Sequence, residues 1–203
     1  MPRKRLIRTH QFCYHIHSRS NNKEWFYIPP ADTWQYFIKH LKTGKVRFNI
    51  EIHCFVLMSN HYHLLLRTPD ENIDRFMQFF NQSLGKSISS QANRINRIFG
   101  SPYKWSIIND QKYYDSVYRY ILQNPIRKNM TKAIEEYPYS SQFNKEFHEL
   151  VDYNKILTPL HSNYDWLNNL FSYEVNSSIQ HGLTRTFFCP KTDRKDWKRS
   201  YII

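Results

Sequence analysis

The spacing of apolar side chains along the chain predicts alternating strands and amphipathic helices. Residues 12–19, FCYHIHSR, alternate, are rich in aromatic and β-branched side chains and end in a turn-like SNN, which indicates a strand. Apolar residues in 29–44 and 72–98 recur every three or four positions, as on one face of a helix. The predicted elements, in chain order, are a strand over 12–19, a helix over 29–44, strands over 48–58 and 61–67, a helix over 72–98, a strand over 103–109 and a helix over 111–124.

This β-α-β-β-α-β-α order is typical of an α+β, ferredoxin-like antiparallel sheet, which we expect to carry its helices packed on one face. The first helix is expected to stop at Gly44. Only Ser59 and Asn60 separate the next two strands, which suits a hairpin turn. Towards the C-terminus the periodicity weakens. We therefore divide the chain into a domain over 1–145 and an extension over 146–203 that is irregular or contains short helices.

Composition and charge point to a polyanionic partner. The chain has 203 residues, which suits one compact core. Lys and Arg total 29 against 17 acidic residues, and 17% of the residues are aromatic, so the surface should attract phosphates and offer rings on which bases stack. These features favour nucleic acid as the partner, although the charge alone also fits a basic protein that binds none.

Several other classes of protein are disfavoured. The three cysteines form no CxxC pair, which fits a reducing compartment and disfavours a zinc or dithiol site. No apolar run approaches the ~20 residues that span a bilayer, so we expect a soluble, cytoplasmic protein without membrane association. The four glycines form neither a P-loop nor a dinucleotide fingerprint, which argues against ATP-driven chemistry.

The stretch VLMSNHYHLLLR contains two histidines, His61 and His63, one residue apart on a predicted strand. Residues i and i+2 of a strand share a face, so the two imidazoles should project side by side and form the start of a metal site. The triplet alone is a weak signal, because His15-Ile16-His17 has the same pattern. The alternative is a pair of half-buried histidines that bond to their neighbours in the sheet.

Tyr120 and Asn124 are spaced i, i+4 at the end of the last predicted helix, which Pro125 should terminate. Both side chains therefore lie on one stripe, and that stripe could meet the histidines. The alternative for Tyr120 is simple packing. Tyr113, seven residues earlier, lies on nearly the same stripe and is a rival nucleophile.

Several motifs in order resemble those of the REP-associated tyrosine transposases, relatives of the HUH single-strand transposases of bacterial insertion sequences. The motifs are MPRKRL, SRSNNK, VLMSNHYHLLL, YKWSIIND, YRYILQNPIRKNM and YPYSS, spread over residues 1 to 145. The resemblance implies that His61 and His63 are the HUH pair, with Tyr120 as nucleophile and Asn124 as the third protein ligand of a divalent metal, Mg²⁺ or Mn²⁺. His15 aligns with no metal ligand of the family. Two departures are RSNN, where many relatives have RGNN, and Asn as the third ligand, which elsewhere is often Gln, Glu or His.

The function implied is that of a metal-dependent endonuclease and strand transferase for single-stranded DNA, acting at or beside hairpins through a 5′-phosphotyrosine. The expected partner is single-stranded or hairpin DNA, in a bacterial cytoplasm, with the protein a monomer or a homodimer. The candidate DNA-binding residues are Arg3, Lys4, Arg5, Arg19, Asn21, Asn22 and Lys104. The C-terminal extension is a further candidate for DNA contact. Two alternatives remain open: a domesticated hairpin-binding protein that does not cut, and a phosphoesterase that uses a metal-bound water.

Overall fold

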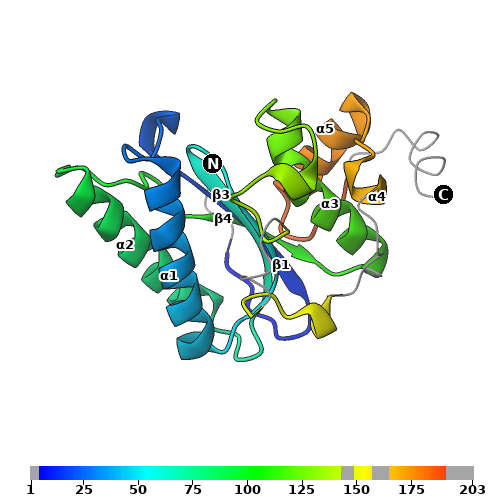
Figure 1. Ribbon diagram of the computed structural model, residues 1–203. Helices are drawn as coiled ribbons and strands as arrows, with labels where there is room; N and C mark the ends of the chain where they lie inside the picture. The colour runs from blue at the N-terminus through cyan, green and yellow to red at the C-terminus, as the bar shows by residue number, and fades with distance from the viewer. Residues whose placement is uncertain (1–4, 143–148, 157–164, 191–203) are drawn as a thin grey trace.

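The computed structural model describes residues 5–142, 149–156 and 165–190 (Figure 1). The predicted helices and strands are all present, in the predicted order. Their bounds are β1 Cys13–Arg19, α1 Pro30–Phe48, β2 Glu51–Leu57, β3 His61–Arg67, α2 Ile73–Gln91, β4 Lys104–Ile108 and α3 Gln111–Arg127. The strands form one antiparallel sheet in the order β2-β3-β1-β4. The α+β, ferredoxin-like fold class is therefore confirmed.

The sheet separates two layers of helices (Figure 1). α1 and α2 cover one face, where Tyr14 and Leu64 belong to the core. α3 covers the opposite face and packs with Val56 and Leu65. The expectation that all helices lie on one face is therefore corrected for α3. The physical reason is that Leu65 alternates with Leu64 and Leu66 along β3, so this strand is apolar on both faces and needs a cover on each.

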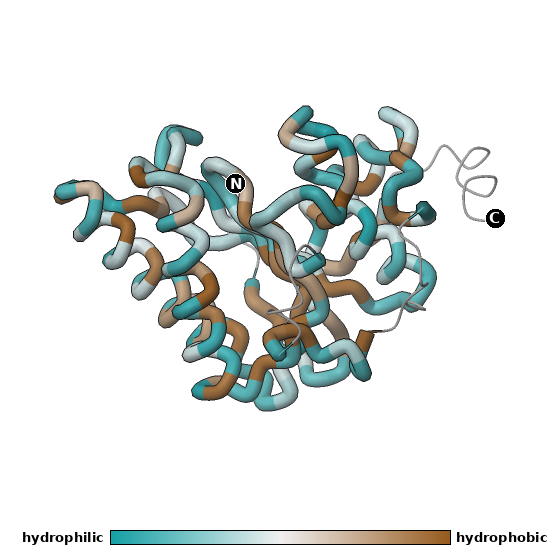
Figure 2. The backbone as a smooth tube through the Cα atoms, in the orientation of Figure 1, coloured by the Kyte–Doolittle hydropathy of each residue, from teal (hydrophilic) through white to brown (hydrophobic). Residues whose placement is uncertain are grey.

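The two helices of the first layer also differ from their predicted ends. α1 continues past Gly44 to Phe48, because Gly44 is buried where α1 meets α2: a Cβ atom there would lie 2.7 Å from Cε2 of Phe76. This glycine permits a close approach of two helices and does not act as a stop. α2 ends at Gln91, and Asn93 just beyond it has a left-handed φ of 50°. Figure 2 shows apolar segments gathered between these helices and the sheet.

α3 runs through Pro125 to Arg127 and does not stop before the proline. A proline has no N–H to donate to the carbonyl four residues earlier, here that of Ile121. Nδ2 of Asn124 donates to this carbonyl at 3.4 Å and to the Tyr120 carbonyl at 2.8 Å. The side chain of Asn124 thus supplies hydrogen bonds where the proline removes one, and the helix continues for a further half turn or so.

Both edge strands of the sheet pair with later segments of the chain. Beside β4, Ile107 forms a parallel bridge with Phe187, and its N–H donates to the Thr186 carbonyl at 2.8 Å. Beside β2, Val56 forms an antiparallel bridge with Ser140. The chain after α3 is therefore attached to the sheet at both edges.

Within the C-terminal extension the structure describes α4, Asp165–Asn168, and α5, Tyr173–Gly182, which lie beside α3 (Figure 1). Leu167 of α4 and Ile179 of α5 are buried in the same cluster as the apolar face of α3. The division of the chain at residue 145 stays a prediction. None of the helices in the described residues combines the length and the hydropathy that a membrane span requires.

Candidate active site

Four histidines gather on the face of the sheet that α3 covers. The register of β1 and β3 sets His17 directly opposite His63, and directly opposed residues share a face. The ring centroid of His17 lies 4.9 Å from that of His63 and 5.1 Å from that of His61. The centroids of His61 and His63 are 5.2 Å apart. His15 stacks on His63 at 5.1 Å, while Tyr62 between the two β3 histidines belongs to the core of the opposite face.

Hydrogen bonds orient the two histidines of β3. Asn60 donates from Nδ2 to the Lys23 carbonyl at 2.5 Å, which fixes its amide so that Oδ1 accepts from Nδ1 of His61 at 2.6 Å. Nδ1 of His61 therefore carries the hydrogen, and Nε2 keeps its lone pair. Nδ1 of His63 lies 2.9 Å from Nε2 of His15, so its Nε2 is likewise left for another ligand. Metal-binding histidines commonly have their second nitrogen engaged in this way.

The imidazoles of this cluster are neutral at pH 7. Burial, and then the positive charges nearby, lower the pKa of His61 to about 3 and that of His17 to about 4. Burial also holds the pKa of His63 well below its usual value. Neutral imidazoles are the form that binds metals. One nitrogen each from His17, His61 and His63 lie within 4.8 Å of one another, so these three residues fit a divalent cation.

Tyr120 of α3 closes the cluster from the opposite layer. Its ring is perpendicular to that of His63, with 5.9 Å between centroids, and lies 6.3 Å from that of His15. The side chain is buried, with 7% of the residue exposed, and this burial raises the pKa of the phenol. Hydrogen bonds with Gln180 and Asn124 act in the opposite direction and favour the phenolate. The phenol is thus held beside the histidines by groups from α3 and α5.

Asn124 lies one turn after Tyr120 on the same side of α3 and lines the same cavity. Its Nδ2 is directed back along the helix, towards the carbonyls of Tyr120 and Ile121. An amide that donates from nitrogen leaves its oxygen to accept or to bind a cation. The role of Asn124 as a metal ligand stays a prediction.

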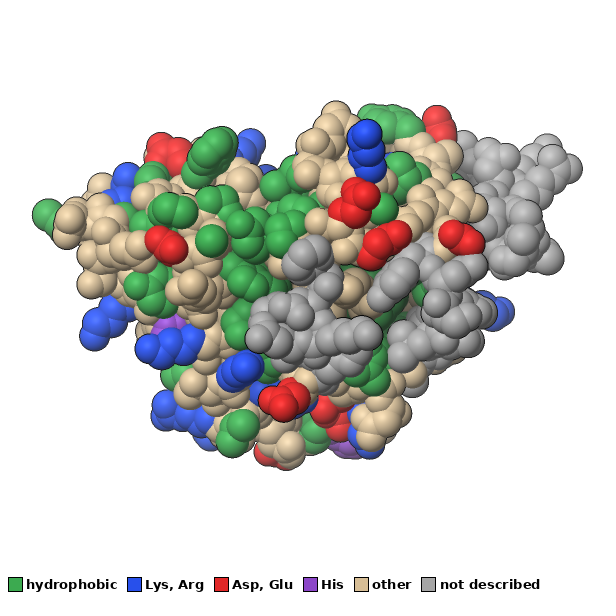
Figure 3. All heavy atoms as spheres, viewed as in Figure 1, with side chains coloured by type: hydrophobic (Ala, Val, Ile, Leu, Met, Phe, Trp, Pro, Cys, Tyr) green, Lys and Arg blue, Asp and Glu red, His purple; other side chains and the backbone are tan. Residues whose placement is uncertain are grey.

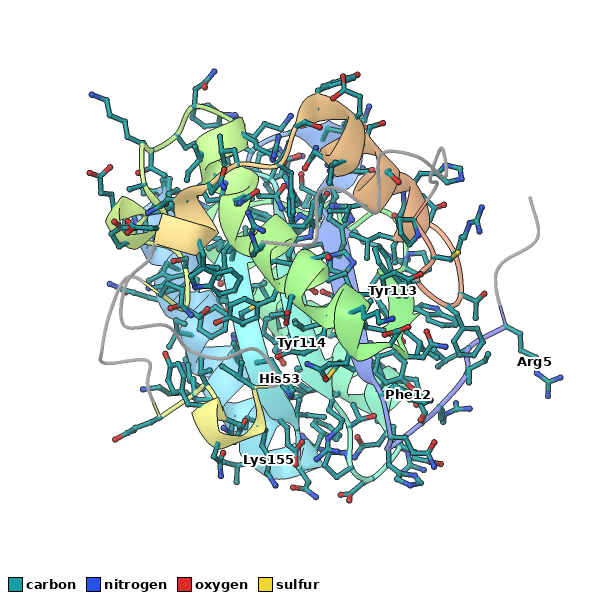
Figure 4. The ribbon with its side chains drawn as sticks, turned by 90° about the vertical axis from the view of Figure 1, so that its right-hand side faces the viewer. Arg5, Phe12, His53, Tyr113, Tyr114 and Lys155 are labelled. Carbon is teal, nitrogen blue, oxygen red and sulfur yellow. The ribbon has the colours of Figure 1, made fainter. Side chains whose placement is uncertain are left out.

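Two other tyrosines of α3 lie away from the histidine cluster. Tyr113 packs its ring against Phe188 at 5.2 Å. The hydroxyl of Tyr114 bonds to Nδ1 of His53 at 2.6 Å, and Figure 4 shows this pair where α3 lies over β2. Of Tyr113, Tyr114 and Tyr120, the structure therefore brings Tyr120 to the histidines.

A cavity of about 800 Å³ opens onto the cluster. It is lined by histidines and basic residues of the sheet together with polar residues of α3 and the C-terminal extension. The polar lining residues are His15, His17, Arg19, His61, His63, Tyr103, Lys104, Tyr120, Asn124, Lys128, Gln180 and Thr184. The combination of neutral metal-binding groups, a phenol and surrounding positive charge suits a phosphodiester substrate.

The predicted DNA-binding residues are distributed over several places. Arg19 and Lys104 line the cavity. Asn21 and Asn22 lie just after β1, in the 3-10 helix Asn21–Lys23. Arg5 is exposed and extends away from the body of the molecule (Figure 4). The other two predicted arm residues, at positions 3 and 4, lie outside the described residues. All of these DNA-binding roles stay predictions.

Basic side chains are not confined to this cavity. In the view of Figure 3, Lys and Arg side chains gather at the lower left of the molecule, over the C-terminal end of α1. In that region Lys45 donates to Asp152 at 2.8 Å and to the Leu150 carbonyl at 3.0 Å. Part of the positive charge of the chain therefore has a structural use.

The site also contains residues that the sequence alone does not single out. His17 belongs to the HxH pattern noted on the first strand, but its meeting with His63 depends on which strands pair. In the sequence, Asn60 indicates only a hairpin turn. Lys128 follows the predicted end of the last helix, and Gln180 lies in the extension, where no motif marked it. For Gln180 the sequence carries no signal that we can identify.

A known protein family and solved structures are similar to this chain. The family described as "Transposase IS200 like" matches residues 9–124, more than half of the chain. A REP-associated tyrosine transposase bound to a REP hairpin has a similar fold, with a TM-score of 0.60 at 19% sequence identity over 85% of this chain and 96% of that chain. A crystal structure from Deinococcus radiodurans R1, described as a transposase, is more distant, with a TM-score of 0.40 at 15% identity over 64% and 96% of the two chains. No curated protein sequence matches the chain. On the family match over residues 9–124, the chain belongs to the IS200-like transposase family.

Proposed function

We propose that the protein is a metal-dependent endonuclease and strand transferase for single-stranded DNA, acting at or beside hairpins through a 5′-phosphotyrosine intermediate. The observation that carries the proposal is the position of Tyr120, whose ring lies 5.9 Å from that of His63 at the wall of a basic cavity. Membership of the IS200-like family supports it. So does the similar fold of a transposase that was solved with a REP hairpin bound.

In this proposal His61, His63 and Asn124 hold a divalent cation, Mg²⁺ or Mn²⁺. When bound, the cation would polarise a DNA phosphate and offset its charge. Arg19 and Lys104, which line the cavity, would hold neighbouring phosphates of the same strand. Arg3, Lys4 and Arg5 would add contacts from the N-terminal arm, and Asn21 and Asn22 would add contacts after β1.

Tyr120 is the proposed nucleophile. Its phenol oxygen attacks the phosphorus, and the bond between the phosphorus and the 3′ oxygen breaks. The phenol loses its proton and the departing 3′ oxygen gains one, so the products are a 5′-phosphotyrosine and a free 3′-hydroxyl. The hydrogen bonds from Asn124 and Gln180, which favour the phenolate, assist this step. A 3′-hydroxyl of another strand can then reverse the reaction at a new junction, so no nucleotide cofactor is required.

A hairpin-binding protein that does not cut is the second candidate. It is favoured by the burial of Tyr120, of which 7% is exposed, because burial raises the pKa of the phenol and leaves less of the reactive phenolate. The intact set of His61, His63 and Tyr120 argues for the nuclease.

The test is incubation of the full chain with single-stranded oligonucleotides that contain hairpins from the regions flanking its gene, in the presence of Mn²⁺, followed by a denaturing gel. A covalent protein–DNA adduct supports the proposal. Binding without cleavage supports the hairpin-binding protein. Cleavage without an adduct indicates hydrolysis by a metal-bound water and contradicts a phosphotyrosine intermediate.

A further inference from the structure

His17 is placed like a metal ligand, although nothing about the proposed function requires it. It lies directly opposite His63 on the neighbouring strand, and its ring lies 5.1 Å from that of His61. A nitrogen of its ring lies within 4.8 Å of one from each of the other two. Small rotations of the side chains are enough to bring three nitrogens at this spacing onto one cation.

Hydrogen bonds already orient the rings of His61 and His63 for a shared cation. Asn60 occupies Nδ1 of His61, and His15 occupies Nδ1 of His63, at 2.6 and 2.9 Å. The Nε2 atoms of His61 and His63 are therefore the ones that remain for a shared ligand. His17 faces both of these rings from β1 and completes a triangle of imidazoles.

The other groups in the cavity decide which cation such a site prefers. Among the described residues that line it there is no Asp or Glu, whereas Arg19, Lys104 and Lys128 carry positive charge. Mg²⁺ depends on hard oxygen ligands, mainly carboxylates and water. Imidazole nitrogens favour the later divalent ions of the first transition row, in the order Mn²⁺, Co²⁺, Ni²⁺. Without carboxylates, a site of three neutral imidazoles should bind Mg²⁺ weakly.

We propose that His17 is a third imidazole ligand beside His61 and His63, and that this trihistidine site selects Co²⁺, Ni²⁺, Zn²⁺ and, more weakly, Mn²⁺ over Mg²⁺. The inference rests on the metal-dependent function proposed above and changes the ligand set and the preferred ion. His15 and Asn60 act in it as positioning residues, through their bonds to His63 and His61.

The first test measures metal binding by the full chain without DNA, after a chelator has removed metal. Co²⁺ is the probe, because its visible absorption depends on the number of nitrogen ligands. His17→Gln should weaken Co²⁺ binding by about 10-fold or more and change the absorption band, since even residues that only orient a ligand cost about that much. His10→Gln is the matched control: His10 is an exposed histidine paired with Glu71, and its loss should leave the titration unchanged. Millimolar Mg²⁺ should not displace Co²⁺ from the parent.

Three results would overturn the inference: a His17→Gln titration that superimposes on that of the parent, ready displacement of Co²⁺ by Mg²⁺, or no Co²⁺ binding by the parent. A second measurement needs no variant and so does not depend on how His17→Gln folds. In the parent, labelled imidazole nitrogens are followed by NMR as Zn²⁺ is added. The rings of His17, His61 and His63 should shift together, and a response from His61 and His63 alone would contradict the proposal.

Both measurements are made without DNA, so they stay separate from the adduct assay. A protein that forms the phosphotyrosine adduct but shifts only two rings keeps the proposed function and loses this inference. A protein that binds Co²⁺ through three rings but forms no adduct keeps the trihistidine site and loses the nuclease.

Discussion

The ring of Tyr120 stands at 88° to that of His63, with 5.9 Å between their centroids. The two residues come from different layers, Tyr120 from α3 and His63 from β3. A helix that packed with α1 and α2 on the other face of the sheet could not make this contact. The position of α3 on the second face therefore creates the candidate active site.

Replacing Tyr120 with Phe should abolish the covalent adduct and reduce strand cleavage by roughly 10³-fold or more, because the attacking oxygen is removed. Hairpin binding should persist, since the ring still packs against His15 and His63. Adduct formation is measured on a denaturing gel and binding by electrophoretic mobility.

Tyr113→Phe is the matched control for this experiment, because Tyr113 lies on the same helix but packs against Phe188. It should form the adduct as the parent does. An adduct that survives in Tyr120→Phe and disappears in Tyr113→Phe would transfer the nucleophile to Tyr113.

Asn124→Ala should raise the metal concentration needed for half-maximal cleavage more than it lowers the rate at saturating metal. The reason is that an amide oxygen is a neutral and modest ligand, and the histidines remain in place. His61→Ala should both raise this metal concentration and lower the cleavage rate at saturating metal. The measurement is a metal titration of the cleavage rate.

If Asn124 serves only the helix end, through its bonds to the carbonyls of Tyr120 and Ile121, the outcome differs. The titration of Asn124→Ala then matches that of the parent, and the variant shows only a lower thermal stability. That result would remove Asn124 from the ligand set.

DNA binding should weaken steeply with added salt. Each phosphate neutralised on a single strand contributes about −0.7 to the slope of log affinity against log salt concentration. Replacing Arg3, Lys4 and Arg5 together with Ala should therefore make the slope less steep by about 2 if all three contact phosphates. Binding is followed by fluorescence anisotropy at several salt concentrations, and an unchanged slope would show that the arm makes no phosphate contact.

Stability should fall in mild acid. Burial lowers the pKa of His15 and His61 from 6.5 to about 3, and that of His17 and His53 from 6.5 to about 4. Between these values and 6.5 the unfolded chain binds more protons than the folded chain, so the free energy of unfolding rises with pH across this window. The stability that these neutral histidines contribute is fully present above their unfolded-state pKa of 6.5. It is lost as the pH falls through their folded-state pKa values.

Urea unfolding of the metal-free protein at pH 7.5 and pH 5 measures this effect, and the midpoint should be lower at the lower pH. His17→Gln should show a smaller difference between the two conditions, because one proton-binding group is gone. Equal midpoints for the parent at both values of pH would contradict the assignment of neutral, buried imidazoles.

Gly44→Ala should destabilise the fold. A Cβ atom at Gly44 would lie 2.7 Å from Cε2 of Phe76, and overpacking of this kind costs about 1–3 kcal/mol, against a gain of about 1 kcal/mol in helix propensity. Gly85→Ala is the control: there the nearest atom, Cδ2 of Phe99, is 3.7 Å away, so the change should be neutral or stabilising. Thermal melting of both variants checks the prediction.

Much of the fold could be predicted from the sequence, because side-chain periodicity records which elements form. The alternation through His61, Tyr62 and His63 correctly placed the two histidines on one face of β3 and Tyr62 on the other, in the core. The hairpin at Ser59 and Asn60 follows from its length and composition. Element ends were harder, because Gly44 has its role in a contact with another helix, which a local pattern does not record.

The remaining parts of the site depend on contacts between distant segments. His17 joins His63 only because β1 pairs with β3, and a single sequence does not state this register. Leu65 marks a second apolar face of β3, but the strand's own sequence does not say which helix covers that face. Gln180 reaches Tyr120 through the packing of α5 on α3, which no local motif encodes.

The bridges at Ile107 and Val56 have a consequence for how the molecule meets other copies of itself. An uncovered edge strand presents unpaired backbone groups that recruit further strands, a common route to aggregation. Here Phe187 covers the outer side of β4 at Ile107, and Ser140 covers the outer side of β2 at Val56. At these positions the backbone is already satisfied within the chain, so the four-stranded sheet is protected against growth by edge-to-edge association.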